Sequence, residues 1–199
     1  MITVGLTGGI ATGKSAVSAI LGTKAGVVLV DADQISRDVC AVGTFGLGKV
    51  IDRFGTEFRS ADGTLDRRAL GALVVDDKSA RNDLEAILHP LIASSITEKM
   101  TAARESRAVM YVVEAALMVE TGSFTQYDLL LVVTCEYDIQ LRRLMRREGI
   151  DEQTAKKWIG TQLPLAKKSE LADHVIENNG DLKDLKQAVE LLLSEITPN

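Results

Sequence analysis

The sequence is poor in three features that would each point to a specialised class of protein. Its two cysteines, Cys40 and Cys135, form no C-x-x-C pair, so we expect neither a disulfide framework nor a cysteine metal cluster. It contains no apolar run of membrane-spanning length. It has 23 Lys and Arg against 28 Asp and Glu, and a net charge of −5 does not attract nucleic acid. We therefore expect a cytoplasmic protein with no membrane and no nucleic acid as partner.

The organisation of the chain is that of an ordinary globular protein. It has 199 residues, of which 46% are hydrophobic, and neither repeats nor low-complexity segments. This length suits one domain with a substantial core and room for a small insertion or lid. The first residues are apolar and lack a basic leader, so we expect a core strand there and no signal peptide.

Short apolar runs alternate with helical patterns along the chain. Strands are expected at residues 2–6, 27–30, 109–113, 129–133 and 174–177. Helices are expected near Lys14 and at residues 80–100, 137–147, 152–162 and 182–196. Such alternation predicts an α/β fold with a mainly parallel sheet, and ligands of such sheets bind at the carboxyl edge of the strands.

The stretch GGIATGKS follows the first expected strand directly. Gly8, Gly13, Lys14 and Ser15 match the spacing G-x-x-x-x-G-K-[ST], and helical spacing begins after them. A glycine-rich loop between a strand and a helix is the context in which this motif binds phosphate. The alternative is a flexible glycine turn that binds nothing, but the complete spacing in this context favours the phosphate loop.

The residue types of this loop fit the chemistry of a nucleotide triphosphate. Glycines let backbone N–H groups approach the phosphates, and the start of the helix adds its unpaired amides. Lys14 is expected to contact the outer phosphates, and the Ser15 hydroxyl to ligate Mg²⁺. The predicted ATP-binding segment consists of Gly8, Gly9, Ile10, Ala11, Thr12, Gly13, Lys14, Ser15 and Ala16.

Two acidic positions follow expected strands. Asp31 and Asp33 come after the second strand, where an extended backbone would place both carboxylates on one face. Asp33 is interpreted either as a base facing a substrate hydroxyl or as the cap of a helix that begins near Gln34. Glu114 ends the third strand, where it would serve as a magnesium-binding or water-binding acid, or lie solvated at the surface.

Arg142, Arg143, Arg146 and Arg147 form a local basic patch in an otherwise acidic chain. On a helix they make two i,i+4 pairs. The planar guanidinium suits transferring phosphates, so the patch is interpreted as part of a lid. The alternative is a solvated basic face.

With these motifs in place, the chain resembles the dephospho-coenzyme A kinases from Thr3 to about Gly180. The resemblance rests on GLTGGIATGKS, DADQISRDV, Phe54-Gly55, DGTLDRRAL, LEAILHPLI, LMVE, QLRRLMRRE, Gln162 followed by LPLAKKS, and ADHVIENNG. The most specific of these are DAD after the second strand, DGTLDRRAL, HPLI and ADHVIENNG. Members transfer the γ-phosphate of ATP to the ribose 3′-hydroxyl of dephospho-coenzyme A. The resemblance implies a three-layer parallel-sheet P-loop kinase fold with a helical acceptor-binding region and a small lid. It also implies ATP and dephospho-CoA as substrates and Mg²⁺ as a cofactor. We expect a monomer or weak homo-oligomer.

The resemblance also implies roles for single residues and segments. Asp33 would be the base, acting with Lys14 and Arg143. Arg143, Arg147, Asn178 and Gly180 would contact ATP, and the acceptor would meet Asp33, Arg67, His89, Glu114 and Leu117. The core would comprise about 1–35, 106–138 and 172–199, the acceptor-binding helical region about 36–105, and the lid about 139–171.

Simpler interpretations exist for three of these residues. Arg67 could be an exposed charge at a helix start. His89, before Pro90, could mark a kinked or broken helix junction, because a residue before proline is pushed away from helical dihedrals. Asn178 could belong only to a turn.

The chain also departs from the family pattern. Val42 and Ala116 stand where the family usually has proline, which loosens loops near the acceptor site. Glu114 stands where the family usually has aspartate, and its longer arm leaves direct metal contact open.

Two rival functions would each require a motif or pocket signature of their own. A nucleoside monophosphate kinase would need a base pocket for its acceptor, and the usual signatures of that pocket are missing. A regulatory nucleotide switch would need an N-K-x-D motif, and the chain has only NNGD.

Overall fold

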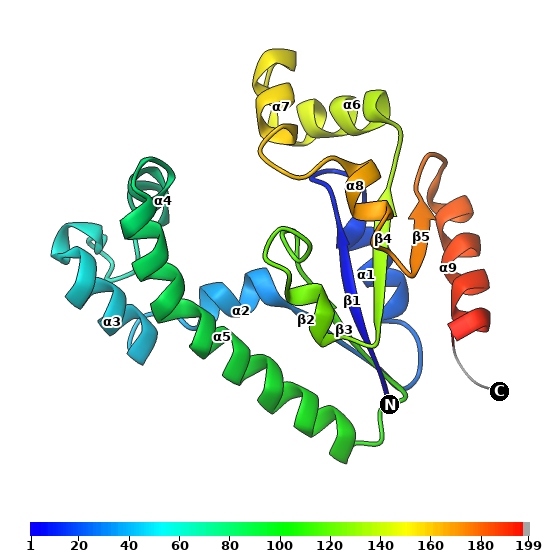
Figure 1. Ribbon diagram of the computed structural model, residues 1–199, viewed down its shortest axis with the longest axis horizontal. Helices are drawn as coiled ribbons and strands as arrows, with labels where there is room; N and C mark the ends of the chain where they lie inside the picture. Colours follow the sequence, from blue (N-terminus) through cyan, green and yellow to red (C-terminus); the bar gives the residue numbers. More distant parts are fainter. Residues whose placement is uncertain (197–199) are drawn as a thin grey trace. The chain divides into compact units, whose positions relative to one another are not determined.

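Five parallel strands form one sheet in the order β2-β3-β1-β4-β5 (Figure 1). The strand order reverses at β1, because β2 and β3 lie on one side of it and β4 and β5 on the other. This arrangement puts the carboxyl end of β1 at the topological switch point, where open α/β sheets bind ligands. The strands are β1 (Ile2–Gly8), β2 (Val27–Asp31), β3 (Met110–Glu114), β4 (Leu129–Thr134) and β5 (His174–Glu177).

The computed structural model describes residues 1–196, so the last three residues of the predicted core segment 172–199 lie outside the described residues. The chain divides into two compact units. The first comprises Met1–Val30 and the residues from Ala103 onward, and the second comprises Asp31–Ala102.

All five predicted strands are present, and their ends differ from the prediction by no more than two residues. β1 continues to Gly8, whereas the prediction ended at Leu6, because glycine is depleted in strands and the glycine-rich stretch begins at Gly8. The ladders with β3 and β4 extend the strand, since Gly8 pairs with Val133.

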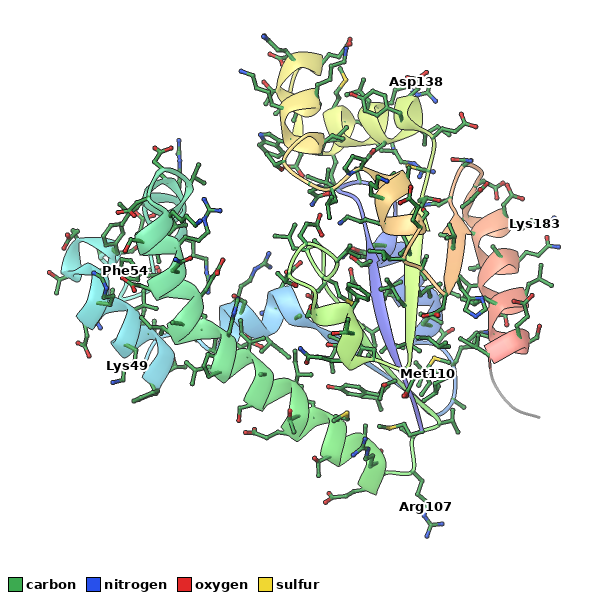
Figure 2. The ribbon with its side chains drawn as sticks, in the orientation of Figure 1. Lys49, Phe54, Arg107, Met110, Asp138 and Lys183 are labelled. Atoms are coloured by element: carbon green, nitrogen blue, oxygen red, sulfur yellow. The ribbon has the colours of Figure 1, made fainter. Side chains whose placement is uncertain are left out.

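The main core lies between one face of the sheet and helices α1 (Lys14–Leu21) and α9 (Leu182–Ile196). Alternate strand residues face this layer, and the helices contribute their apolar stripes. Met110, labelled in Figure 2, is one of the buried strand residues. The buried members are Val4, Leu6, Val17, Ile20, Leu21, Met110, Val112, Leu131, Val133, Ile176, Leu185, Val189 and Leu192.

The opposite face of the sheet is covered closely at Gly5. A Cβ built there would lie 2.6 Å from the sulfur of Met118 and 2.8 Å from the ring of Tyr127. Glycine at this position lets the segment after β3, including the 3₁₀ turn η2 (Ser123–Gln126), approach the sheet.

Helices α6 (Tyr137–Glu148), α7 (Glu152–Ile159) and α8 (Leu165–Ser169) follow β4. The prediction of a helix at 152–162 is wrong at its end, since α7 stops three residues earlier, at Ile159. After that residue the chain tightens into i→i+3 turns, in which Thr161 N–H donates to Trp158 and Gln162 N–H donates to Ile159.

The second unit is helical and has its own small core. Cys40, Leu47, Val50, Ile51, Leu65 and Leu70 are buried together there. Its elements are α2 (Ala32–Asp38), α3 (Phe45–Phe54), η1 (Thr56–Phe58), α4 (Arg67–Asp76) and most of α5 (Lys78–Glu105), whose last three residues belong to the first unit.

Helix α5 continues through Pro90, so the interpretation of His89-Pro90 as a broken junction is wrong. Proline removes one helical hydrogen bond and crowds the preceding turn. Pro90 and His89 are both exposed, so water can satisfy the carbonyl that loses its partner.

Within residues 1–196, no helix combines the length and the apolar character that crossing a membrane requires.

Candidate active site

The phosphate loop lies at the carboxyl end of β1, as predicted. β1 ends at Gly8 and α1 begins at Lys14, and the residues between them form an irregular turn. Two of these residues have left-handed backbones, Ala11 with φ of 59° and Gly13 with φ of 99°. Ala11 therefore carries a local strain that a glycine would not have.

Gly13 is required by a close contact as well as by its backbone. A Cβ at this position would lie 2.0 Å from the side-chain nitrogen of Asn178. That nitrogen donates a hydrogen bond to the carbonyl of Thr12 at 2.8 Å, and Asn178 is buried. Asn178 thus braces the phosphate loop from the segment after β5, which is more than the turn role considered above.

The first turn of α1 presents Lys14 and Ser15. The leading amides of a helix have no intrahelical partner, and the helix dipole is positive at this end. Ser15 is exposed, and within residues 1–196 its hydroxyl makes no hydrogen bond. Together these groups can bind an anion and offer one oxygen ligand to a cation.

Lys14 forms a buried ion pair with Glu114 at the end of β3. The ammonium lies 2.5 Å from Oε1, and the two side chains are 13% and 7% exposed. The hydroxyl of Ser18, four residues after Lys14 on the same face of α1, donates to Oε2. The interpretation of Glu114 as a solvated surface acid is therefore wrong, and its carboxylate holds Lys14 at the phosphate loop.

A second buried ion pair lies at the base of the loop. The ammonium of Lys168 in α8 is 0% exposed, and it lies 2.8 Å from Glu120 Oε1. It donates to the carbonyl of Ala116 at 2.9 Å and to that of Gly8 at 3.5 Å. Glu120 also accepts the N–H of Leu163 at 3.0 Å. The pair ties α8 to the end of β1 and to the segment after β3.

Glu120 is held ionised by these partners. Burial by itself raises the pKa of a carboxyl group, but the bonds from Lys168 and from the Leu163 N–H outweigh burial, so the pKa of Glu120 lies below its usual value. Its second oxygen is buried and has no hydrogen-bond partner in the described residues.

We expect Lys168→Met to lower the free energy of unfolding by about 3 kcal/mol at neutral pH. Removing one partner of a buried pair leaves an uncompensated charge, and the lower end of the usual range applies because Glu120 is 19% exposed. The change leaves helix propensity nearly unaltered. Denaturant unfolding of both proteins measures the difference.

The matched control is Lys167→Met on the same helix, where the exposed pair with Glu170 contributes below about 1 kcal/mol. A lowered carboxyl pKa stabilises the fold above the pKa of the unfolded chain, and this stabilisation is lost as the pH falls through the folded value. The deficit of Lys168→Met should therefore shrink in acid. Equal effects of the two substitutions would contradict the buried pair.

Asp31 and Asp33 open helix α2 in the second unit. Asp31 is the cap, because its Oδ1 accepts the N–H groups of Asp33 and Gln34 at 2.8 and 3.1 Å. Asp33 is exposed within the first turn and is not the cap. The expectation that both carboxylates share the face of an extended strand is wrong, since the helix begins at Ala32.

The other predicted acceptor residues lie on three different segments. Arg67 is exposed at the start of α4, and its guanidinium donates to the carbonyls of Ser36 and Arg37 at 3.3 and 3.1 Å. It thereby braces the end of α2. His89 is exposed in α5, and Leu117, in the segment after β3, is 48% exposed.

The arginines of α6 have different surroundings. Arg143 donates to the carbonyls of Asn178 and Gly180 at 2.8 and 3.4 Å, so it braces the segment that also holds Thr12. Arg147 is exposed and pairs with Glu148. A hollow of about 420 Å³ lies beside them and is lined by Ile139, Arg142, Arg143, Arg146 and Asn179.

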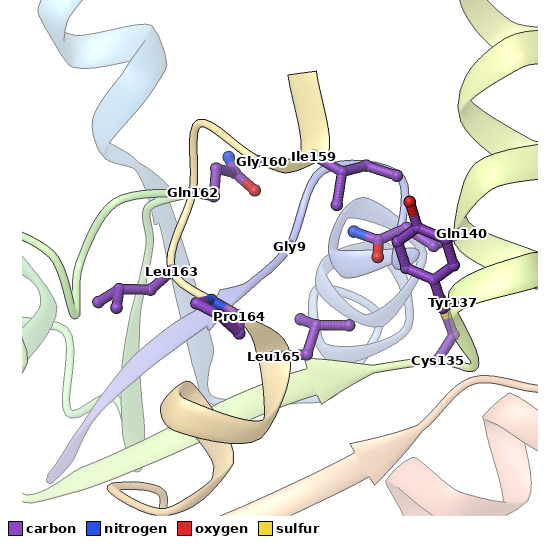
Figure 3. A pocket seen from close by; sticks show the side chains of 10 residues that line it. All are labelled: Gly9, Cys135, Tyr137, Gln140, Ile159, Gly160, Gln162, Leu163, Pro164 and Leu165. Atoms are coloured by element: carbon purple, nitrogen blue, oxygen red, sulfur yellow. The ribbon is translucent and has the colours of Figure 1, made fainter. Parts of the chain in front are cut away.

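A cavity of about 410 Å³ adjoins the phosphate loop at Gly9 (Figure 3). Two glutamines, Gln140 and Gln162, reach from this cavity to Ile10. The cavity is lined by Gly9, Cys135, Tyr137, Gln140, Ile159, Gly160, Gln162, Leu163, Pro164 and Leu165.

Sequence reasoning missed most of the side chains that hold the loop. Gln140 and Lys168 were given no role, and Ser18 was overlooked although its i,i+4 spacing from Lys14 puts both on one helical face.

A parallel sheet of this strand order, with a glycine-rich loop leading into a helix that begins with lysine, defines the chain as a P-loop kinase. Comparison with known proteins gives the narrower class. The dephospho-CoA kinase family model matches residues 2–184, and the chain belongs to that family.

Known proteins are similar to this chain over nearly its whole length. A dephospho-CoA kinase of Frankia casuarinae is 44% identical over 190 residues, which are 96% of this chain and 81% of the relative. The solved structure of TT1252 from Thermus thermophilus is 31% identical, with a TM-score of 0.83 over 99% of this chain and 98% of that one. A dephospho-CoA kinase from Campylobacter jejuni is 26% identical, with a TM-score of 0.72 and coverage of 98% and 96%.

Proposed function

We propose that the protein transfers the γ-phosphate of ATP to the ribose 3′-hydroxyl of dephospho-CoA, giving CoA and ADP. The carrying observation is that the family match spans residues 2–184, which include the phosphate loop and the whole helical unit Asp31–Ala102. A family assignment over so much of the chain supports the acceptor as well as the nucleotide.

ATP phosphates bind at the loop and at the first turn of α1. The N-terminal amides of α1 and the Lys14 ammonium supply positive charge at one point. Lys14 is held in place by Glu114, so the arriving phosphates share the ammonium with a buried carboxylate. The ion pair therefore sets the position of Lys14 before the nucleotide arrives.

The residues present fit a magnesium ion bound together with ATP. Within the described residues, no cluster of three or more His, Cys, Asp or Glu could hold a metal. Mg²⁺ needs no such cage, because it keeps water and binds phosphate oxygens with one or two protein ligands. The exposed Ser15 hydroxyl would be the ligand, and the ion would supply charge neutralisation at the phosphates.

Asp33 orients the acceptor hydroxyl and takes its proton. Asp31 already caps α2, so the helix start does not require Asp33 for that purpose. In the loose transition state of phosphoryl transfer the alcohol loses its proton late, which suits a weak base such as carboxylate. Arg67, His89, Glu114 and Leu117 remain proposed acceptor-binding residues.

Arg143 and Arg147 serve the nucleotide from α6. The hollow beside Arg142, Arg143 and Arg146 joins basic side chains to the segment after β5, and such a hollow can take the nucleoside part of ATP. Asn178 and Gly180 shape this segment, since both carbonyls accept from Arg143.

We also propose a cytoplasmic location, because both cysteines are free and buried, as in proteins of reducing compartments. A monomer or weak homo-oligomer, and the division into core, acceptor-binding region 36–105 and lid 139–171, remain predictions.

The test is a panel of acceptors offered to the protein with ATP and Mg²⁺. Dephospho-CoA, AMP and water alone are compared by continuous measurement of ADP. Rapid ADP formation is expected with dephospho-CoA and not with the other two. Phosphorylation of AMP would favour a nucleoside monophosphate kinase, and slow acceptor-independent hydrolysis would favour a nucleotide switch.

A further inference from the structure

Both backbone polar groups of Ile10, in the middle of the phosphate loop, are bound by glutamine side chains. Gln162 Oε1 accepts the N–H of Ile10 at 2.7 Å. Gln140 Nε2 donates to the carbonyl of Ile10 at 2.8 Å. We call this pair the amide clamp.

The two glutamines come from separate segments of the predicted lid region. Gln140 is buried in the first turn of α6, and Gln162 lies in the turn between α7 and α8 (Figure 3). Their separation from Ile10 along the chain is 130 and 152 residues. Loop shape and lid position therefore depend on each other.

The clamp acts on the part of the loop that most needs support. The next residue, Ala11, holds a left-handed backbone with φ of 59°, which is unfavourable for a residue with a Cβ. Hydrogen bonds to both groups of Ile10 fix the backbone immediately before this strained residue. Gln140 also limits the space at Gly9, where a Cβ would lie 2.7 Å from its Nε2.

We propose that Gln140 and Gln162 are positioning residues that hold the phosphate loop in its nucleotide-binding shape. This inference rests on the proposed function for the identity of the nucleotide. It extends that function by assigning the shape of the loop to two residues that act through the backbone of Ile10. Gln140 acts as a donor, whereas Gln162 acts as an acceptor.

The test replaces each glutamine by methionine, which keeps the length of the side chain and removes its hydrogen bonds. We expect Gln140→Met and Gln162→Met each to weaken ADP binding about tenfold, because one loop group loses its partner. The KM for ATP should rise by a similar factor, while kcat at saturating ATP changes by less than about threefold. Gln153→Met, on the exposed surface of α7, is the matched control and should leave all three unchanged.

Hydrogen exchange at the Ile10 amide separates positioning from packing. Gln162→Glu keeps an acceptor oxygen, so the amide should stay as protected as in the unaltered protein, whereas Gln162→Met should expose it. Because Gln162 is only partly buried, this pair remains informative even if Gln140→Met fails to fold.

Two outcomes would overturn the clamp. One is a loss of thermal stability in both methionine variants with unchanged ADP affinity, which would indicate packing alone. The other is equal exchange at Ile10 in Gln162→Glu and Gln162→Met. ADP binding needs no acceptor, so a protein that binds ADP but does not phosphorylate dephospho-CoA would refute the proposed function and leave this test standing.

Discussion

Asp33→Asn lowers the turnover number about 10²–10⁴-fold while the affinity for ATP stays nearly the same. The magnitude is that of losing a positioned general base. The amide keeps the size of the side chain and cannot accept the proton of the acceptor hydroxyl. Steady-state kinetics with dephospho-CoA, together with ATP binding measured by calorimetry, give the two quantities separately.

The matched control is Asp38→Asn, the same change at the other end of the same short helix. Asp38 is exposed and accepts a hydrogen bond from Gln34, which asparagine can also accept. Its kinetics should match those of the unaltered protein. If Asp33→Asn behaves like Asp38→Asn, Asp33 has no role in proton transfer.

Lys14→Met is expected to impair both ATP binding and turnover, with a loss in turnover of about 10²–10³-fold. A fixed positive charge aimed at the transferring phosphate stabilises the transition state, and losing one such group lowers turnover by about this factor. The same substitution leaves Glu114 buried with Ser18 as its remaining partner, so it should also reduce stability. Kinetics and denaturant unfolding are measured on the same preparations.

A double variant separates these two consequences. Lys14→Met combined with Glu114→Gln removes the uncompensated carboxylate, and most of the lost stability should return. Turnover should stay low, because the charge at the phosphates is still missing. Recovery of turnover together with stability would mean that Lys14 supports the fold and not the phosphates.

Local patterns explain why the strands and the phosphate loop could be predicted. The apolar runs of β1, β3 and β4 are short, bounded and mostly buried, so the sequence identifies them without tertiary information. The loop motif spans eight residues, and its meaning depends on the strand before it and the helix after it. Both neighbours are visible in the sequence from Ile2 to Leu21.

The braces of the loop could not be predicted in the same way. Asn178, Lys168 and Gln162 reach the loop from positions more than 150 residues away in the chain. No spacing rule connects residues so distant, and the folded sheet alone brings them together. The residue types of Lys168 and Gln162 gave no signal, since Gln and Lys are common on surfaces. Only the family resemblance drew attention to Asn178 and to the segment at Gln162.

The capping of α2 shows how a shift of two residues changes an interpretation. Asp31 and Asp33 are equally good caps by composition. The choice depends on where β2 stops, and strand ends are the least certain part of a sequence-based prediction. Once the helix begins at Ala32, Asp31 is the cap.

The most direct measurement of the central claim is the position of the transferred phosphate. The protein is incubated with dephospho-CoA and ATP labelled at the γ-phosphate, and the product is analysed by phosphorus NMR and by counting the label. We expect one labelled phosphate on the ribose 3′-oxygen for every ADP formed. Label released as inorganic phosphate, or carried by any other oxygen of the acceptor, would contradict the account.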